Sequence, residues 1–203
     1  MKGSSEKEKV LKLIRNSLLD KAEIPYPSLD MDSDFYAPLN DDPVMIFAEN
    51  IVESGGKFIY CKNDDDLIDK LFSLIDYRNW LNHIVSYGDK LKEFLIAGGL
   101  HTNDIKDNET EVGMILCHCI AARNGSIIIT SNQAEKNELQ KFPNILIIIA
   151  YTSQITIDIK YCLNQLSESM PQWITTINPS YLLKEEIKEL YLFTVENLIQ
   201  TEK

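Results

Sequence analysis

The chain has 203 residues, of which 44% are hydrophobic and 25% are charged, a balance typical of an ordinary globular protein. Its formal net charge is −11, and its sequence pI is about 4.7. This acidic balance argues against binding to nucleic acid or to an anionic membrane surface, because both attract clustered Lys and Arg. The length fits one domain with a small appendage.

Neither a membrane span nor a secretion signal is expected. The longest apolar run, NILIIIAY at 144–151, is far shorter than the roughly 18 residues that a membrane-spanning helix needs. The start MKGSSEKEKVLKLI lacks the apolar core and small-residue cleavage site of a signal peptide. Four cysteines are few for this length, so a disulfide framework is not expected. We therefore expect a cytoplasmic protein that does not insert into membranes.

Residues 1–43 are predicted to form an N-terminal helical arm. An amphipathic helix is expected at 5–22, because its apolar residues recur with a period close to 3.6. These residues are Val10, Leu11, Ile14, Leu18 and Leu19. Residues 24–43 contain four prolines and no periodicity, which is typical of an extended surface connection. The arm is expected to pack on the main domain, at 44–203, or on a partner protein.

Helices and strands alternate from residue 44. The pattern predicts helices at 44–54, 63–80 and 88–99, and strands at 57–61 and 83–87. Glycine pairs end the first and third helices, and either Asn63 or Asp64 caps the second. This alternation favours a parallel sheet with helices packed on it.

From Glu111 onward, strands dominate the prediction. The apolar segments VGMILCHCI (112–120) and SIIIT (126–130) flank Arg123–Asn124–Gly125, and an Asn-Gly pair in this setting indicates a β-hairpin. The remaining elements are a buried strand at 144–151, a helix at 156–169 and late strands at 172–178 and 190–197. The inner positions of that helix are expected to be Ile157, Tyr161, Leu163 and Leu166. The predicted fold class is α/β, with a mixed, largely parallel sheet flanked by helices.

Cys117, His118 and Cys119 are adjacent, which raises the question of a metal site. Within a strand, the two cysteines would point to one face and the histidine to the other, so the three cannot converge within about 2.0–2.3 Å of one ion. The sequence has no CxxC or HxxxH pair to complete a tetrahedral set. We therefore expect no metal, and we expect both cysteines to pack as small apolar side chains.

A catalytic residue is not assigned. A cysteine nucleophile would need a neighbouring base, and His118 would lie on the opposite face, so the base would have to come from a separate segment. Glycine-rich phosphate-binding motifs are absent from the sequence. The turn from Arg123 to Ser126 combines backbone N–H groups with Arg and Ser side chains, and it is either a small-anion site or a plain hairpin turn.

Four segments follow one another in the order of a known family. They are EVGMILCHCIAARNGSIIIT (111–130), NILIIIAY (144–151), DIKYCLNQL (158–166) and ITTINPSYLLKEEIKELYLFTVE (174–196). Together with FAENIVESGGKFIYC (47–61), they resemble the LUD domain, which is the domain of lactate utilisation protein C and its relatives, the LutC/YkgG family. The resemblance extends over nearly the whole chain.

The family's most characteristic motif, A-E-T-G-T after an opening glycine, is partly retained. Positions that match this motif or the later G-P-S turn are Gly113, Ala122, Gly125, Ser126, Pro179 and Ser180. Arg123 replaces the acid of the motif, Asn124 replaces a threonine, and His118 stands near a further acidic position. An arginine in place of an acid reverses the local charge, so the family's ligand could not be held in the same way.

The resemblance implies a fold like that of NagB, RpiA and the CoA transferases. It also implies a role in oxidising L-lactate to pyruvate beside partner proteins that carry iron–sulfur clusters. The chain itself is expected to bind no cofactor, because its cysteines lack the tight spacing of a cluster motif.

Three functions remain open. The first is an accessory subunit that binds partner subunits or a small organic anion. The second is an enzyme acting on a CoA ester, sugar phosphate or folate, with Glu111 as the nearest carboxylate, and the third is a degenerate family member that serves as an interaction module. The candidate ligand-binding residues are Glu111, His118, Arg123, Asn124, Gly125, Ser126 and Ser180.

Overall fold

The computed structural model describes Val10 and residues 41–81, 83–103, 111–135, 142–166, 170–185 and 187–197. Apart from Val10, the predicted amphipathic helix lies outside the described residues, and so does most of the extended connection after it. Across the described part of the chain, no helix is long and apolar enough to cross a membrane.

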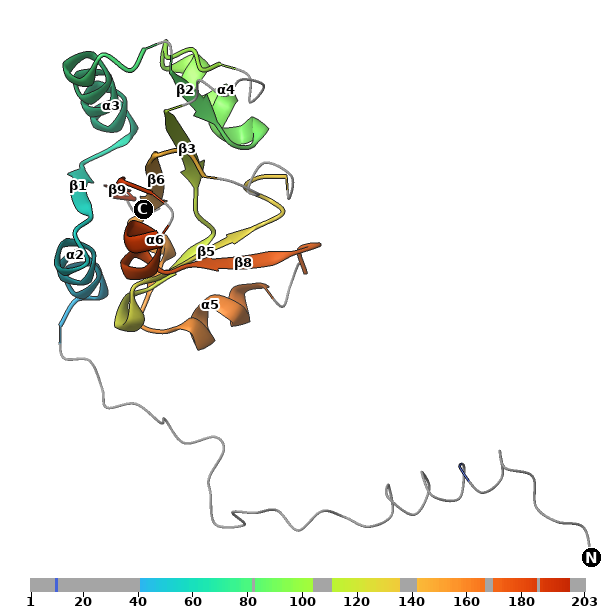
Figure 1. The fold of residues 1–203 in the computed structure, drawn as a ribbon. Helices are drawn as coiled ribbons and strands as arrows, with labels where there is room; N and C mark the ends of the chain where they lie inside the picture. The colour runs from blue at the N-terminus through green and yellow to red at the C-terminus, as the bar shows by residue number, and fades with distance from the viewer. Residues whose placement is uncertain are drawn as a thin grey trace, which may run out of the picture. The chain divides into compact units, whose positions relative to one another are not determined.

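Five parallel strands form the larger sheet of the protein (Figure 1). In pairing order they are β1 (Lys57–Cys61), β9 (Glu189–Val195), β6 (Ile145–Tyr151), β3 (Val112–Leu116) and β2 (Ile84–Ser86). The central strand β6 pairs along its whole length with β9 and along five residues with β3. Because all five strands run in the same direction, their carboxyl ends meet at one side of the sheet, which we call the carboxyl edge.

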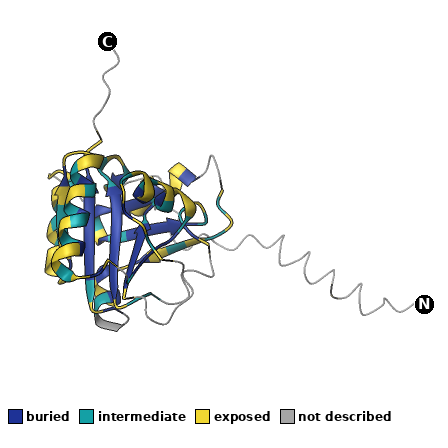
Figure 2. Cartoon of the chain, turned by 90° about the horizontal axis from the view of Figure 1, so that it is seen from above, coloured by how far each residue is buried: buried dark blue, intermediate teal, exposed yellow. Residues whose placement is uncertain are grey.

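Strand β6 is apolar on both faces and so divides the protein interior into two cores. Successive side chains of a strand point to opposite faces. Ile147 and Ile149 therefore lie in the core beneath two helices, whereas Leu146 and Ile148 lie in the core between the two sheets. Figure 2 shows the strands as the buried centre of the molecule, with exposed residues on the outer sides of the helices.

Helices α3 (Asp64–Arg78) and α4 (Asp89–Ala97) cover one face of the parallel sheet. Asn63 is the N-cap of α3, because its side chain accepts a hydrogen bond of 2.9 Å from the backbone N–H of Asp66. The buried positions recur at helical spacing and fill the core under the sheet: Leu67, Leu71, Ile75, Leu91 and Leu95.

Helix α2 (Pro43–Glu53) lies on the opposite face and buries Phe47 and Ile51. Asp42 caps it by accepting a hydrogen bond of 2.7 Å from the backbone N–H of Val44, and Pro43 occupies the first helical position, where a missing N–H costs nothing. Helix α6 (Pro179–Glu185) lies on the same side and adds Leu182 to this core.

A second sheet of four strands packs over this face. Its pairing order is β7 (Ile155–Thr156), β4 (Cys119–Ala121), β5 (Ser126–Thr130) and β8 (Ile174–Ile177). Strand β5 is antiparallel to both of its neighbours, whereas β4 and β7 are parallel. Helix α5 (Ile159–Leu166) covers the outer face of this sheet, where Cys162 packs with residues of β4 and β5.

The predicted fold class is confirmed: the protein is α/β, with a largely parallel sheet flanked by helices. The antiparallel strands belong to a separate sheet rather than to an extension of the parallel one. The elements expected between residues 44 and 99 are all present, and Asn63 rather than Asp64 is the cap of α3.

The single strand predicted at 112–120 is wrong, because the chain changes sheets within it. The backbone N–H of Cys117 donates to the carbonyl of Ile149 in β6, at 3.1 Å. The next N–H, of His118, donates to the carbonyl of Ile128 in β5, at 2.8 Å. Two adjacent residues therefore connect the two sheets, and the alternation of faces assumed for a continuous strand does not apply to them.

Two further predictions are corrected near the end of the chain. Residues 179–185 form α6, which the sequence pattern did not indicate. In α5, the buried residues are Cys162 and Leu166, so the inner position predicted for Leu166 is confirmed. The inner positions predicted for Tyr161 and Leu163 are wrong, because both are about half exposed, and Ile157 lies before the helix and is exposed. Cys162 faces inward, where it is bonded to Cys119 of β4 and packs with Ala121 and Ile128.

A network of charged and aromatic side chains joins α3 to the amino ends of β1 and β9. The Glu189 carboxylate accepts hydrogen bonds from Lys57, from Arg78 at 2.5 Å and from the Tyr191 hydroxyl at 2.7 Å. Trp80 packs edge-on against the Tyr191 ring at 5.8 Å between centroids. Burial opposes ionisation of Glu189, but the hydrogen bonds from Lys57, Arg78 and Tyr191 outweigh it and lower its pKa to about 2.

Glu189→Gln is expected to lower the free energy of unfolding at pH 7 by about 1–2 kcal/mol. The pKa shift alone implies about 3 kcal/mol, but the Lys57 side chain is 47% exposed and solvent screens its charge. Because the folded-state pKa lies below the unfolded value of about 4.3, this stabilisation is present above that pH and is lost as the pH falls towards 2.

Urea denaturation of the wild type and Glu189→Gln at pH 7 and at about pH 3 measures this effect. The matched control is Glu53→Gln, at an exposed position that ends α2. A stability difference of the same size at both pH values would show that Glu189 acts through packing rather than through its charge.

Candidate functional site

The carboxyl edge of the parallel sheet gathers polar side chains from several strands. In open α/β sheets, ligands bind in the crevice outside the carboxyl ends of the strands. Here the residues directly after β3 are Cys117 and His118, and a turn of Thr152–Gln154 follows β6. The described chain after β9 is Glu196 and Asn197.

A cleft of about 650 Å³ opens at this edge, between the start of α2 and the ends of β1, β6 and β9. We call it the α2 cleft. It is lined by Asp42, Pro43, Val44, Met45, Phe58, Tyr60, Thr152, Ser153, Ile155, Glu196 and Asn197. Its volume is in the range of small-molecule sites, which are mostly apolar with a few polar groups.

The polar groups of the α2 cleft are held by hydrogen bonds. The Tyr60 hydroxyl donates to the Glu196 carboxylate, and this bond raises the pKa of Tyr60. The Thr152 hydroxyl accepts a hydrogen bond of 3.2 Å from the backbone N–H of Asn197, which ties the turn after β6 to the end of β9. The cleft therefore has a phenol and a carboxylate that are hydrogen-bonded to each other, beside apolar lining residues.

A second hollow of about 540 Å³ adjoins the first, and Pro43 and Ile155 line both. Its outer wall comes from α5, through Tyr161, Asn164 and Gln165. The position of α5 therefore decides the shape of this side of the edge.

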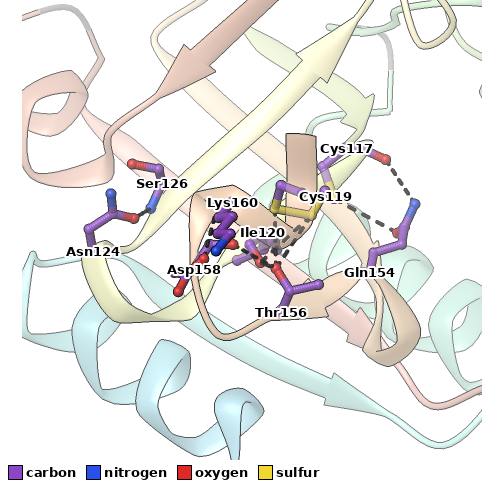
Figure 3. Close-up of a disulfide and its surroundings, with 10 residues drawn as sticks. Cys117, Cys119, Ile120, Asn124, Ser126, Gln154, Thr156, Asp158 and Lys160 are labelled. Carbon is purple, nitrogen blue, oxygen red and sulfur yellow. Dashed lines mark hydrogen bonds between the residues drawn. A yellow bond between two sulfur atoms is a disulfide. The ribbon is translucent and has the colours of Figure 1, made fainter. Parts of the chain in front are cut away.

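A disulfide between Cys119 and Cys162 attaches α5 to the second sheet. The S–S distance is 2.08 Å, the bond links residues 43 positions apart, and both side chains are fully buried. Figure 3 shows the bond beside Thr156, whose hydroxyl lies 3.2 Å from the sulfur of Cys162. The expectation that Cys119 only packs is therefore wrong, because the fold places the partner sulfur opposite β4.

Cys117 is a buried free thiol at the end of β3. The Gln154 side chain bridges it to β6, since its amide nitrogen donates to the carbonyl of Cys117 at 3.0 Å and its oxygen accepts from the N–H of Tyr151 at 2.8 Å. Burial raises the pKa of the Cys117 thiol to about 12. The thiol is therefore protonated at neutral pH, which does not suit a nucleophile.

His118 occupies the junction between the two sheets. Its Nε2 atom is buried and has no hydrogen-bond partner, and burial lowers the pKa of the side chain. An unsatisfied buried polar atom in a folded protein calls for an explanation, and a ligand group is one of them. In the described part of the chain, no three His, Cys, Asp or Glu side chains converge on a common point as a metal site requires.

The hairpin turn is a short 3-10 helix, Ala122–Asn124, followed by Gly125. Gly125 has a φ of 68°, the left-handed region that favours glycine. The N–H groups of Arg123, Gly125 and Ser126 all donate within the protein, to Ile157, Ala122 and Asn124. An anion at this turn would therefore depend on side chains, chiefly the half-buried Arg123.

The seven candidate residues from the sequence lie in different places. His118 is at the carboxyl edge, and Arg123–Ser126 form the turn between β4 and β5. Ser180 is in α6, the element after β8, and Ile177 of β8 pairs with Ile127, the residue directly after the turn. Glu111 precedes β3 at the opposite end of the sheet, about 16 Å from the carboxyl edge at about 3.3 Å per strand residue. Glu111 and His118 therefore do not share a pocket.

The residues of the α2 cleft were not predicted from the sequence. The sequence contains one local indication of this cleft, because Phe58 and Tyr60 are two positions apart in β1 and so point to the same face. The carboxylate that completes the pair could not be found from local sequence, since Glu196, the hydrogen-bond partner of Tyr60, is 136 residues further along the chain.

The protein is similar to a known protein in its fold rather than in its sequence. No protein-family model matches the sequence, and no curated protein matches it. The structure matches the crystal structure of a DUF162 family protein from Deinococcus radiodurans, with a TM-score of 0.62 and 12% sequence identity. The match covers 78% of this chain and 99% of that protein. The protein therefore has the α/β fold of a DUF162 structure, and DUF162 corresponds to the LUD domain.

Replacing both Cys119 and Cys162 with alanine is expected to lower the free energy of unfolding by about 2–4 kcal/mol, because the bond closes a long loop in the unfolded chain. Denaturation with and without dithiothreitol measures this, and reductant is expected to destabilise the wild type but not the variant. Alkylation of the denatured wild type should label two cysteines, Cys61 and Cys117, before reduction. Labelling of all four cysteines without reductant would contradict the disulfide.

The wild type is expected to lose free energy of unfolding on acidification, and His118→Gln is expected to reduce that loss by about 1 kcal/mol or less. Since burial lowers the folded-state pKa, the unfolded chain takes up the proton more readily, and the native state loses stability as the pH falls through about 6.5. Thermal unfolding at about pH 7.5 and about pH 5.5 tests this, with the exposed His101→Gln as the control. Equal acid sensitivity in wild type and His118→Gln would exclude this role for His118.

Proposed function

We propose that the protein is an accessory component of an L-lactate utilisation system, similar to lactate utilisation protein C, that binds partner subunits or a small organic anion. The observation that carries the proposal is the shared DUF162 fold, which extends over 99% of the matched protein. The sequence resemblance of residues 111–130 to the LUD motif supports the same assignment.

In this proposal, the iron–sulfur clusters that receive electrons from lactate belong to the partner subunits. The chain contributes binding rather than redox chemistry, since both of its free thiols, Cys61 and Cys117, are buried, and burial raises their pKa values to about 11 and about 12. The carboxylate of a small organic anion would lie at the hairpin turn, next to Arg123. A guanidinium is the side chain best suited to a carboxylate, because its N–H groups match the two oxygens.

Deletion of the gene tests the proposal in the organism that encodes it. Growth on L-lactate as the carbon source is expected to be lost, whereas growth on glucose is expected to continue, and a plasmid copy of the gene should restore growth on L-lactate. Normal growth of the deletion strain on L-lactate, where no second LUD protein is encoded, would reject the proposal.

A tagged copy expressed from the native locus tests whether the protein binds partner subunits. After growth on L-lactate, purification is expected to recover iron-containing partner subunits, detected by mass spectrometry and iron analysis.

The charge reversal Arg123→Glu tests the anion site, and it is expected to abolish the ability of a plasmid copy to restore growth of the deletion strain on L-lactate. The matched control is Lys160→Glu, a charge reversal at an exposed position on a neighbouring segment, which is expected to restore growth. Full complementation by a folded Arg123→Glu protein would exclude an anion site at the turn.

A further inference from the structure

We propose that the α2 cleft binds a small organic cation, an ammonium group carried on an apolar or aromatic body. This inference goes beyond the proposed function, which places an organic anion at the hairpin turn. It depends on the charge, the aromatic side chains and the size of the cleft.

The charge of the cleft is of one sign. The described residues that line it include two carboxylates, Asp42 and Glu196, and no Lys, Arg or His. The net charge of the whole chain, −11, adds to a negative potential that attracts cations. A helix start would by itself favour an anion, but Asp42 already accepts the hydrogen bond from the first turn of α2.

Aromatic rings supply the second element of cation recognition. Phe58 and Tyr60 both line the cleft from one face of β1, and Tyr60 is 41% exposed. A cation is attracted to the face of an aromatic ring within about 6 Å of its centre, which is the basis of aromatic pockets for ammonium groups. The hydrogen bond from Tyr60 to Glu196 places a ring and a carboxylate side by side, so one ammonium group can contact both.

The remaining lining fits the body of such a ligand. Pro43, Val44, Met45 and Ile155 provide apolar lining, of which Ile155 is buried and Met45 is exposed, and Thr152 and Asn197 provide polar groups. The volume of about 650 Å³ exceeds what a bare metal ion or an ammonium ion would fill, and it lies within the range for small organic ligands.

Isothermal titration calorimetry on the full-length protein tests the proposal with benzyltrimethylammonium as the probe. Benzyl alcohol is the neutral control, and benzenesulfonate is the anionic control of similar size. The cation is expected to bind about tenfold more tightly than either control, and to weaken as salt is raised from about 0.02 M to about 0.5 M.

Two variants locate the site. Glu196→Gln is expected to weaken cation binding by about three- to tenfold, because it removes the charge and keeps the shape. Asp42→Asn is expected to weaken it as well, without loss of the helix cap, since Asn and Asp are equally good at this position. Glu53→Gln, an exposed position outside the cleft, is expected to leave the affinity unchanged.

The proposal is overturned by any of three results. These are the absence of measurable heat with the cation, binding of benzenesulfonate as tight as that of the cation, and unchanged affinity in a folded Glu196→Gln protein. Each result is independent of growth on L-lactate, so failure here would leave the proposed function standing, and the reverse also holds.

Discussion

The burial of β6 on both faces is the constraint on which the rest of the structure depends. Its apolar side chains alternate between two cores, so helices must cover one face and a second layer must cover the other. Each fully buried Ile or Leu contributes about 1.5–3 kcal/mol relative to exposure, which makes this arrangement the main source of stability. The second layer is the four-stranded sheet, and the chain reaches it through the two residues Cys117 and His118.

The parallel arrangement of the strands determines which side chains lie together at the carboxyl edge. Because the five strands are parallel, segments distant in sequence end side by side, and the turns after them meet α2. The same parallel pairing places Glu111 at the opposite end, away from the turns that line the α2 cleft. The disulfide in turn holds α5 against the second sheet and defines the neighbouring hollow. Charge then distinguishes two regions: the cleft carries carboxylates, whereas the hairpin turn carries Arg123.

Much of the fold could be predicted because its signals are local. The alternation of apolar residues, the caps and the glycine pairs located the helices and strands from 44 to 99, and the Asn-Gly pair located the β4–β5 hairpin. The division of residues 112–120 between two sheets could not be predicted, since an apolar run has the same pattern whichever sheet it joins. The same limit applies to α5, whose inward-facing residue Cys162 is bonded to Cys119, 43 positions earlier in the chain.

The sequence by itself determined the fold class of the protein, an acidic α/β chain, because periodicity and turn residues act over a few positions. The hairpin turn could be predicted as a candidate site, because Arg123–Ser126 are contiguous in sequence. The α2 cleft could not, because Tyr60 and Glu196 are far apart in sequence. Only the tertiary structure decided that Cys119 meets Cys162, that His118 stands between two sheets and that two carboxylates share one cleft with two aromatic rings. The physical reason is that these contacts join residues whose pairing depends on strand order, and strand order is set by the packing of the whole core rather than by any local pattern.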